Sequence, residues 1–203
     1  SRQFITSIAL ILLNVVAAKY GDGVIAALTI SSRILALAYM IMIGWGQGFQ
    51  PICAMNYGAK QYDRVKKAFK FAVTGGTLFL IIAAILLYVF SEPLIRTMSN
   101  DNEVILAGTE ILRMQCITMP LLGYFAISSM LMQNIGQYFW ASIISISRQG
   151  IFYIPLLYTL SNIFGQFGIY LLQPVADVLS FGLAVILVRK IKFANDKCKK
   201  DGI

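Results

Sequence analysis

The sequence predicts an all-α, polytopic membrane protein: a bundle of six transmembrane helices. The 203 residues are 58% hydrophobic and only 13% charged, whereas soluble domains average roughly 25% charged residues. Long apolar runs approach or exceed the roughly 20 residues that a helix needs to cross a bilayer. The few charges sum to +8 and cluster between these runs. A nucleic-acid-binding protein would instead carry a basic face on a soluble scaffold, so no nucleic acid partner is expected.

Six apolar segments are the predicted spans: residues 3–20, 23–58, 68–91, 102–134, 138–161 and 166–190. The second is longer than a span requires, so we expect it to tilt, kink or extend beyond the bilayer. The polar stretch from Gln133 to Gln137 separates the fourth span from the fifth. Pro120, Pro155 and Pro174 mark possible bends in the last three spans, because proline removes a helix donor.

The basic residues predict the orientation of the bundle, since lysine and arginine concentrate on the cytoplasmic side. Both termini and the loop between the second and third spans are therefore expected in the cytoplasm, with residues 191–203 as a tail and the plasma membrane as location. Twelve of the 17 basic residues lie at these ends: Arg2, Lys60, Arg64, Lys66, Lys67, Lys70, Arg189, Lys190, Lys192, Lys197, Lys199 and Lys200.

The basic segment 60–70 has two interpretations. Tyr62, Val65 and Phe69 recur at helical spacing among the basic residues, as in a short helix that lies on anionic membrane lipids. Asp63 and Lys67 stand four residues apart and are expected to pair. Alternatively, the segment acts only as a determinant of topology.

Enzymatic chemistry is not expected. The chain has no histidine, and its three cysteines, at positions 53, 116 and 198, are far apart. These features indicate no metal site, disulfide framework or imidazole relay. No Gly-Lys-Ser/Thr phosphate-binding motif is present. The sequence therefore predicts neither a cofactor nor ATP-driven work by this chain.

Charged residues inside the spans are the first candidates for function, because each costs about 2.5–3.5 kcal/mol to insert. Arg148 and Asp177 lie about 13 and 18 Å from the cytoplasmic ends of consecutive helices, so we expect them to pair. Such a pair is either a gate or coupling-ion site, or a static contact that sets helix packing. Glu110 and Arg113 are expected to neutralise each other across one helical turn. Arg33 has no carboxylate within helical reach and either lines an aqueous cavity or is held by packing.

The second span carries further candidates. Gln47 and Gln50 either line a transport pathway or form interhelical hydrogen bonds. Gly44 and Gly48 offer a face for close helix packing, and Pro51 is a candidate hinge. Pro155 and Pro174 are candidate hinges in the fifth and sixth spans. Four aromatic residues face either a hydrophobic substrate or lipid and neighbouring helices: Tyr124, Phe125, Phe152 and Tyr153.

Several of these motifs resemble one known family. The run GWGQGFQPICAMNYGAKQYDRVKK, Gly44 to Lys67, is similar to the eighth helix and following cytoplasmic segment of the multidrug and toxic compound extrusion (MATE) family. Arg148-Gln149-Gly150 with Pro155 resembles its eleventh helix, and Gln173 to Asp177 its twelfth. The resemblance implies the C-terminal lobe of a twelve-helix transporter, with an N-terminal six-helix lobe missing.

The resemblance also implies an activity: secondary active efflux of small hydrophobic or cationic drug-like compounds, in exchange for Na⁺ or H⁺, with membrane lipids as surroundings. The lone lobe is not expected to be active. The full set of pathway or coupling candidates is Arg148, Asp177, Arg33, Gln47 and Gln50, together with Gln149 and Tyr153.

The chain departs from the family in one respect. Some sodium-coupled members use carboxylates on the seventh and tenth helices, but residues 3–18 and 114–133 contain none. The coupling site therefore lies in the missing lobe, or Asp177 substitutes for it. Two other functions remain open at this stage. One is a flippase for lipid-linked oligosaccharides from the same superfamily, and the other is a membrane scaffold without transport.

Overall fold

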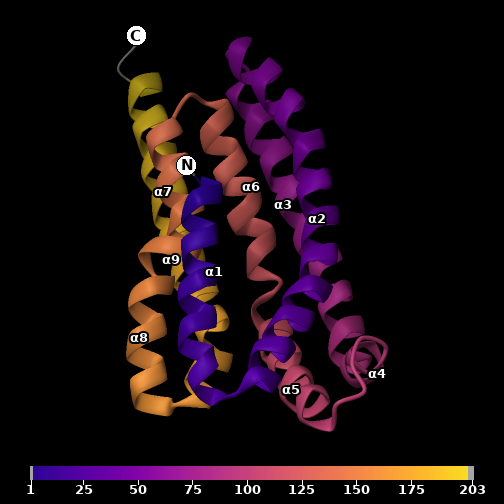
Figure 1. Ribbon diagram of the computed structural model, residues 1–203. Coiled ribbons are helices and arrows are strands. Elements are labelled where there is room, and N and C mark those ends of the chain that lie inside the picture. The colour runs from indigo at the N-terminus through magenta and orange to yellow at the C-terminus, as the bar shows by residue number, and fades with distance from the viewer. Residues whose placement is uncertain (1, 201–203) are drawn as a thin grey trace.

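The computed structural model describes the backbone of residues 2–200 and the side chains of residues 6–190 (Figure 1). Helices separated by short turns make up this part of the chain, and it contains no strand. In order they are α1 (Arg2–Ala17), η1 (Ala18–Tyr20), α2 (Asp22–Gly58), α3 (Tyr62–Val89), α4 (Ser91–Arg96), α5 (Asn102–Thr118), α6 (Leu121–Asn134), α7 (Tyr138–Ile146), the π-helical η2 (Ser147–Ile151), α8 (Tyr153–Phe164) and α9 (Gln166–Lys200).

The predicted all-α membrane bundle is confirmed. Within the described residues, four helical stretches are long and apolar enough to cross a membrane: Asp22–Gly58, Tyr62–Val89, Tyr138–Phe164 and Gln166–Lys190. Helices α5 and α6 qualify as a fifth, bent span. The remaining candidate, Thr6–Tyr20, is a shorter apolar helix. With η1, α1 reaches a length of about 28 Å, close to the roughly 30 Å of a bilayer core.

The predicted bend at Pro120 is confirmed, because α5 and α6 meet there at an angle of 56°. Pro120 has no backbone N–H, and its ring collides with the carbonyl four residues earlier in a regular helix. The chain turns tightly instead, with Leu122 N donating to Met119 O and Gly123 N to Pro120 O. In contrast, α2 and α9 run through Pro51 and Pro174 without a helix break.

Glycines of α3 allow it to pack closely against α2. They are not the glycines for which the sequence predicted this role. A Cβ at Gly75 would meet the Trp45 ring, and the Trp45 indole N–H donates to Ala72 O at 3.0 Å. Gly46 of α2 packs against Met130 of α6. The predicted packing face of Gly44 and Gly48 is corrected: both are exposed, with nothing within 4 Å of an added Cβ in the described part of the chain.

The segment 60–70 also needs a correction, because no break separates it from the third span. Helix α3 begins at Tyr62 and continues to Val89. Val65 and Ala72 are both buried on one face of α3, and this continuous packing holds the basic residues on the first turns of a spanning helix. The expected ion pair between Asp63 and Lys67 does not form within the described residues.

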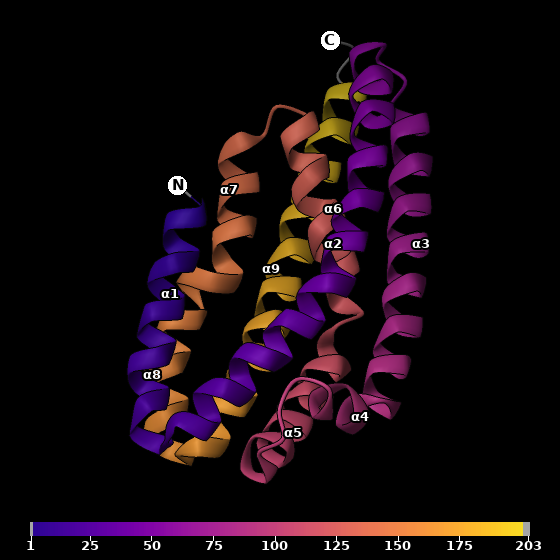
Figure 2. The same cartoon turned by 45° about the vertical axis from the view of Figure 1, so that its right-hand side comes forward.

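The basic ends gather at one end of the bundle. Figures 1 and 2 show the α2–α3 turn, the start of α1 and the far end of α9 toward the same end, at the top of both views. The α1–α2 and α8–α9 turns and the short α4 lie at the opposite end. Helix α2 packs against α3, α5 and α6, while α9 packs against α5, α6 and α8. Helices α5 and α6 thus contact both α2 and α9 and connect the two sides of the bundle.

Candidate functional site

A wide helical turn places the first charged side chain. Residues Ser147–Ile151 form a π-helical turn between α7 and α8, in which Phe152 N donates to Ser147 O at 3.0 Å, five residues back. Pro155 is the third residue of the regular helix that follows, α8, and it cannot donate a backbone bond to the end of this turn. Single π-turns inside helices often occur at functional sites, and this one contains Arg148.

Arg148 and Asp177 form the ion pair that the sequence predicted. Arg148 Nε donates to Asp177 Oδ1 at 2.6 Å. The Asp177 side chain is 3% exposed and that of Arg148 is 18% exposed. A lone charge buried this deeply would be costly, so each group compensates the charge of the other.

Side chains of α9 itself and of α5 complete the surroundings of the carboxylate. Gln173 Nε2, one turn earlier on α9, donates to Asp177 Oδ1 at 3.0 Å. Thr118 Oγ1, at the end of α5, donates to Asp177 Oδ2 at 3.4 Å. The Arg148 guanidinium also lies over the Tyr39 ring of α2, 5.4 Å from its centroid, within the range of a cation–π contact. One carboxylate thus connects α2, η2, α5 and α9.

Polar atoms without partners extend from this cluster. Gln115 stands one turn before Thr118 and Ser180 one turn after Asp177, and both residues are buried. In the described part of the chain, Gln115 Oε1 and Ser180 Oγ have no hydrogen-bond partner. Buried polar atoms normally find partners, so these two sites suit a water molecule or an ion. The cluster therefore has hydrogen-bonding capacity that the described side chains do not use.

Sequence reasoning missed Thr118, Gln173 and Tyr39. Gln173 had a detectable signal, because it precedes Asp177 by one helical turn and shares its face. Thr118 lies next to the bend at Pro120, which turns the end of α5 toward α9. Nothing in the sequence indicated Tyr39, because the aromatic face that Arg148 meets depends on the rotation of α2.

Within the described residues, none of the other predicted candidates donates a hydrogen bond to Asp177. Gln149 accepts a hydrogen bond from Thr6 Oγ1 at 2.6 Å and so ties η2 to α1. Tyr153 is 6% exposed and packs in an apolar core with α1 and α2. Arg33 and Gln47 are exposed on α2, and Gln50 beside them is partly buried. No described side chain forms an ion pair with Arg33.

The predicted Glu110–Arg113 pair is not formed in the described structure. Arg113 Nε instead donates to Ser91 Oγ at 3.0 Å, and its guanidinium lies 5.5 Å from the centroid of the Tyr88 ring. Glu110 and Arg113 are both exposed. The short helix α4, absent from the sequence prediction, begins at Ser91 and supplies the competing partner.

The fold and its buried charges define a class of protein. A bundle of apolar helices that contains a bent span, a π-turn and an ion pair deep inside the membrane is typical of secondary transporters. The family model of MatE matches residues 2–159, and the chain belongs to this family, whose members are secondary transporters rather than enzymes.

Curated relatives are similar over most of this chain. The multidrug export protein MepA of Staphylococcus haemolyticus is 25% identical over 182 residues, which is 90% of this chain and 40% of that protein. MepA of Staphylococcus aureus strain MSSA476 is 25% identical over 178 residues, with 88% and 39% covered. The chain thus spans about two-fifths of the length of these relatives.

Solved structures share the fold. The Vibrio cholerae MATE transporter VcmN in its bent form superposes with a TM-score of 0.86 at 22% identity, covering 93% of this chain and 43% of that one. An outward-facing multidrug resistance MATE family transporter gives a TM-score of 0.88 at 18% identity, with 97% and 44% covered. The match corresponds to one lobe of each larger protein.

Proposed function

We propose that this chain is the C-terminal six-helix lobe of a secondary active exporter, which removes small hydrophobic or cationic drug-like compounds in exchange for Na⁺ or H⁺. Membership of the MatE family supports this, as do relatives that are multidrug export proteins. Coverage of about two-fifths of those relatives leaves room for a second lobe. The comparisons do not favour a lipid-linked oligosaccharide flippase or a scaffold without transport.

The buried Arg148–Asp177 pair carries the mechanistic part of the proposal. A proton or Na⁺ that reaches Asp177 would compete with Arg148 for the carboxylate, because each neutralises the same negative charge. Loss of the ion pair would free Arg148, which stands on the π-turn, and would loosen the contact between η2 and α9. The bound cation would thereby shift the helix arrangement. The unpartnered Gln115 Oε1 and Ser180 Oγ nearby are suitable additional ligands.

The second part of the proposal is the position of the pathway. Arg33 and Gln47 share the exposed face of α2, whereas Asp177 is buried behind it. We infer that this face borders the substrate pathway and the other lobe, and that Asp177 acts on it through Tyr39, whose ring contacts Arg148. We also propose that both chain ends and the α2–α3 turn face the cytoplasm, because the basic residues concentrate at that end of the bundle.

Substitution of Asp177 tests the coupling role. In the complete transporter that contains this chain, we expect Asp177→Asn to abolish drug efflux at normal expression, since the amide cannot exchange a cation with Arg148. Glu92→Gln is the matched control, because Glu92 is an exposed carboxylate paired with Arg96 at 2.9 Å. Efflux of an organic cation dye from cells would be measured. Efflux at the wild-type rate in Asp177→Asn would contradict the proposal.

A double substitution separates coupling from packing. Buried ion pairs can often be replaced by apolar residues of similar volume without loss of stability. Arg148→Met combined with Asp177→Leu should therefore restore the thermal stability that Asp177→Asn loses. If the pair serves only helix packing, efflux will return together with stability. We expect stability without efflux.

A further inference from the structure

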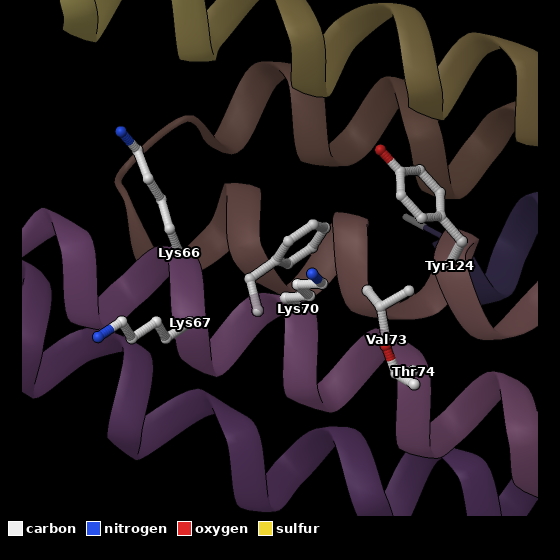
Figure 3. Close-up of a pocket in the computed structure, with 7 residues that line it drawn as sticks. Lys66, Lys67, Lys70, Val73, Thr74 and Tyr124 are labelled. Atoms are coloured by element: carbon white, nitrogen blue, oxygen red, sulfur yellow. The ribbon is translucent and has the colours of Figure 1, made fainter.

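A cavity lies near the basic end of the bundle, apart from the buried ion pair. It has a volume of about 370 Å³ and opens between α3 and α6. Its lining combines three lysines with aromatic, aliphatic and hydroxyl side chains: Lys66, Lys67, Phe69, Lys70, Val73, Thr74 and Tyr124. We call it the basic pocket. Figure 3 shows Tyr124 on the wall across from the lysines of α3.

We propose that the basic pocket binds one anionic phospholipid of the cytoplasmic leaflet, with its phosphate at the lysines and its acyl chains along α3. The inference goes beyond transport, and it rests on the proposed orientation, in which the basic end of the bundle lies at the cytoplasmic side of the membrane. It concerns a site that neither the ion pair nor the exposed face of α2 includes.

Charge complementarity indicates the headgroup. Lys67 and Lys70 are exposed and form no ion pair within the described residues. Among the acidic side chains between residues 6 and 190, Asp63 alone lies on the first turns of α3. An anionic phosphate would therefore meet excess positive charge, and basic residues near a surface attract anionic lipids.

The depth of the pocket indicates a lipid rather than a soluble phosphate. From Lys66 to Thr74, the lining descends about 12 Å along α3, from the headgroup level into the span. Part of its wall is aromatic: the Phe69 and Tyr124 rings pack edge to face with centroids 6.0 Å apart, and Tyr124 packs in the same way on Phe181 at 5.4 Å. These rings line a path suited to a glycerol backbone and the start of an acyl chain.

An exposed apolar stripe continues the path. Below Lys70 and Thr74, the same face of α3 presents Ile81 and Ile85, which are 39% and 59% exposed. Helical spacing aligns these residues, because positions four and seven apart share a face. The sequence along this face thus changes from lysine to threonine to isoleucine, which matches the polarity of a phospholipid from phosphate to chain.

Native mass spectrometry of the complete, delipidated transporter would test the site. Three probes would be titrated: phosphatidylglycerol, phosphatidylethanolamine and glycerol 3-phosphate. We expect one tightly bound phosphatidylglycerol, with the other two probes bound at least tenfold more weakly. Lys70→Gln should weaken that binding about fivefold, and Lys67→Gln with Lys70→Gln about 25-fold. Arg64→Gln is the matched control: it removes one positive charge from the same helix outside the pocket and should leave binding unchanged.

Three outcomes would overturn the proposal. Equal weakening by Arg64→Gln and Lys70→Gln would mean diffuse attraction to the membrane surface. Equal binding of phosphatidylethanolamine would exclude recognition of net charge. Displacement of phosphatidylglycerol by glycerol 3-phosphate at similar concentration would assign the pocket to a soluble phosphate. Thermal unfolding of the lipid-free variants at the wild-type temperature would exclude misfolding as the cause.

Discussion

Asp177 shows what a single buried charge requires of its surroundings. Its two oxygens receive hydrogen bonds from Arg148, Gln173 and Thr118, which come from three different elements. The pairing with Arg148 was predictable, because residue number along antiparallel helices translates into depth at 1.5 Å per residue. The contribution of Thr118 was not, because it depends on the direction in which α5 bends at Pro120.

Substitutions of Arg33 and Arg113 should have opposite effects on stability and efflux, although both are exposed arginines within apolar spans. Arg113→Gln loses the hydrogen bond to Ser91 and the contact with Tyr88. We expect it to destabilise the complete transporter by about 1–2 kcal/mol with little change in efflux per folded molecule. Arg33→Gln should keep its stability within about 0.5 kcal/mol and reduce efflux at least severalfold, because Arg33 lies on the proposed pathway face.

Thermal unfolding in detergent and dye efflux normalised to folded protein would measure the two effects. Equal destabilisation by both substitutions, with no effect on efflux, would mean that Arg33 also serves only packing.

At the scale of the elements, the prolines act in different ways. Pro120 separates two helices at an angle of 56°, Pro155 follows a π-turn, and Pro51 and Pro174 lie inside continuous helices. Proline thus indicates where a helix can be interrupted, but it does not determine whether the helix breaks, widens into a π-turn or continues. The result depends on whether neighbouring helices stabilise the broken arrangement, as α9 does where Thr118 contacts Asp177.

Two glycines of α9 provide an element-scale prediction. A Cβ at Gly168 would collide with the Leu160 carbonyl of α8, whereas one at Gly182 would meet nothing within 4 Å. We expect Gly168→Ala to separate α8 from α9 and to destabilise the transporter by about 1–3 kcal/mol. Gly182→Ala should be neutral, or stabilise it by up to about 1 kcal/mol.

The unfolding temperature of the complete transporter would report both glycine changes. The close approach of α8 and α9 would be contradicted if Gly168→Ala unfolded at the wild-type temperature or above.

At the scale of the whole molecule, the arrangement of the ends supports the proposed orientation. The α2–α3 turn and both described chain ends lie toward one end of the bundle (Figure 2). Two chain ends on the same side of a membrane require an even number of spans between them. The positive charges of the sequence concentrate at that same end.

Cysteine labelling from the two sides of the membrane tests that orientation. In a complete transporter without reactive native cysteines, Asp63→Cys at the basic end should react with an impermeant maleimide only after the cytoplasmic side is exposed. Asn100→Cys, before α5 at the opposite end, should react in intact cells. Both positions are exposed and neither side chain makes a hydrogen bond within the described structure. The reverse pattern would refute the orientation.

Three properties were predictable from the sequence: the membrane bundle, the order of its apolar segments, and the similar positions of Arg148 and Asp177 along neighbouring helices. These properties follow from local composition, because transfer of each segment into a membrane depends mainly on its own side chains. Three other features of the described residues depend on tertiary packing: Gly46 packs while Gly44 and Gly48 do not, Arg113 binds Ser91 instead of Glu110, and three lysines share a pocket with Tyr124. Such contacts depend on how each helix is rotated against its neighbours, and that rotation results from the packing of all the helices together.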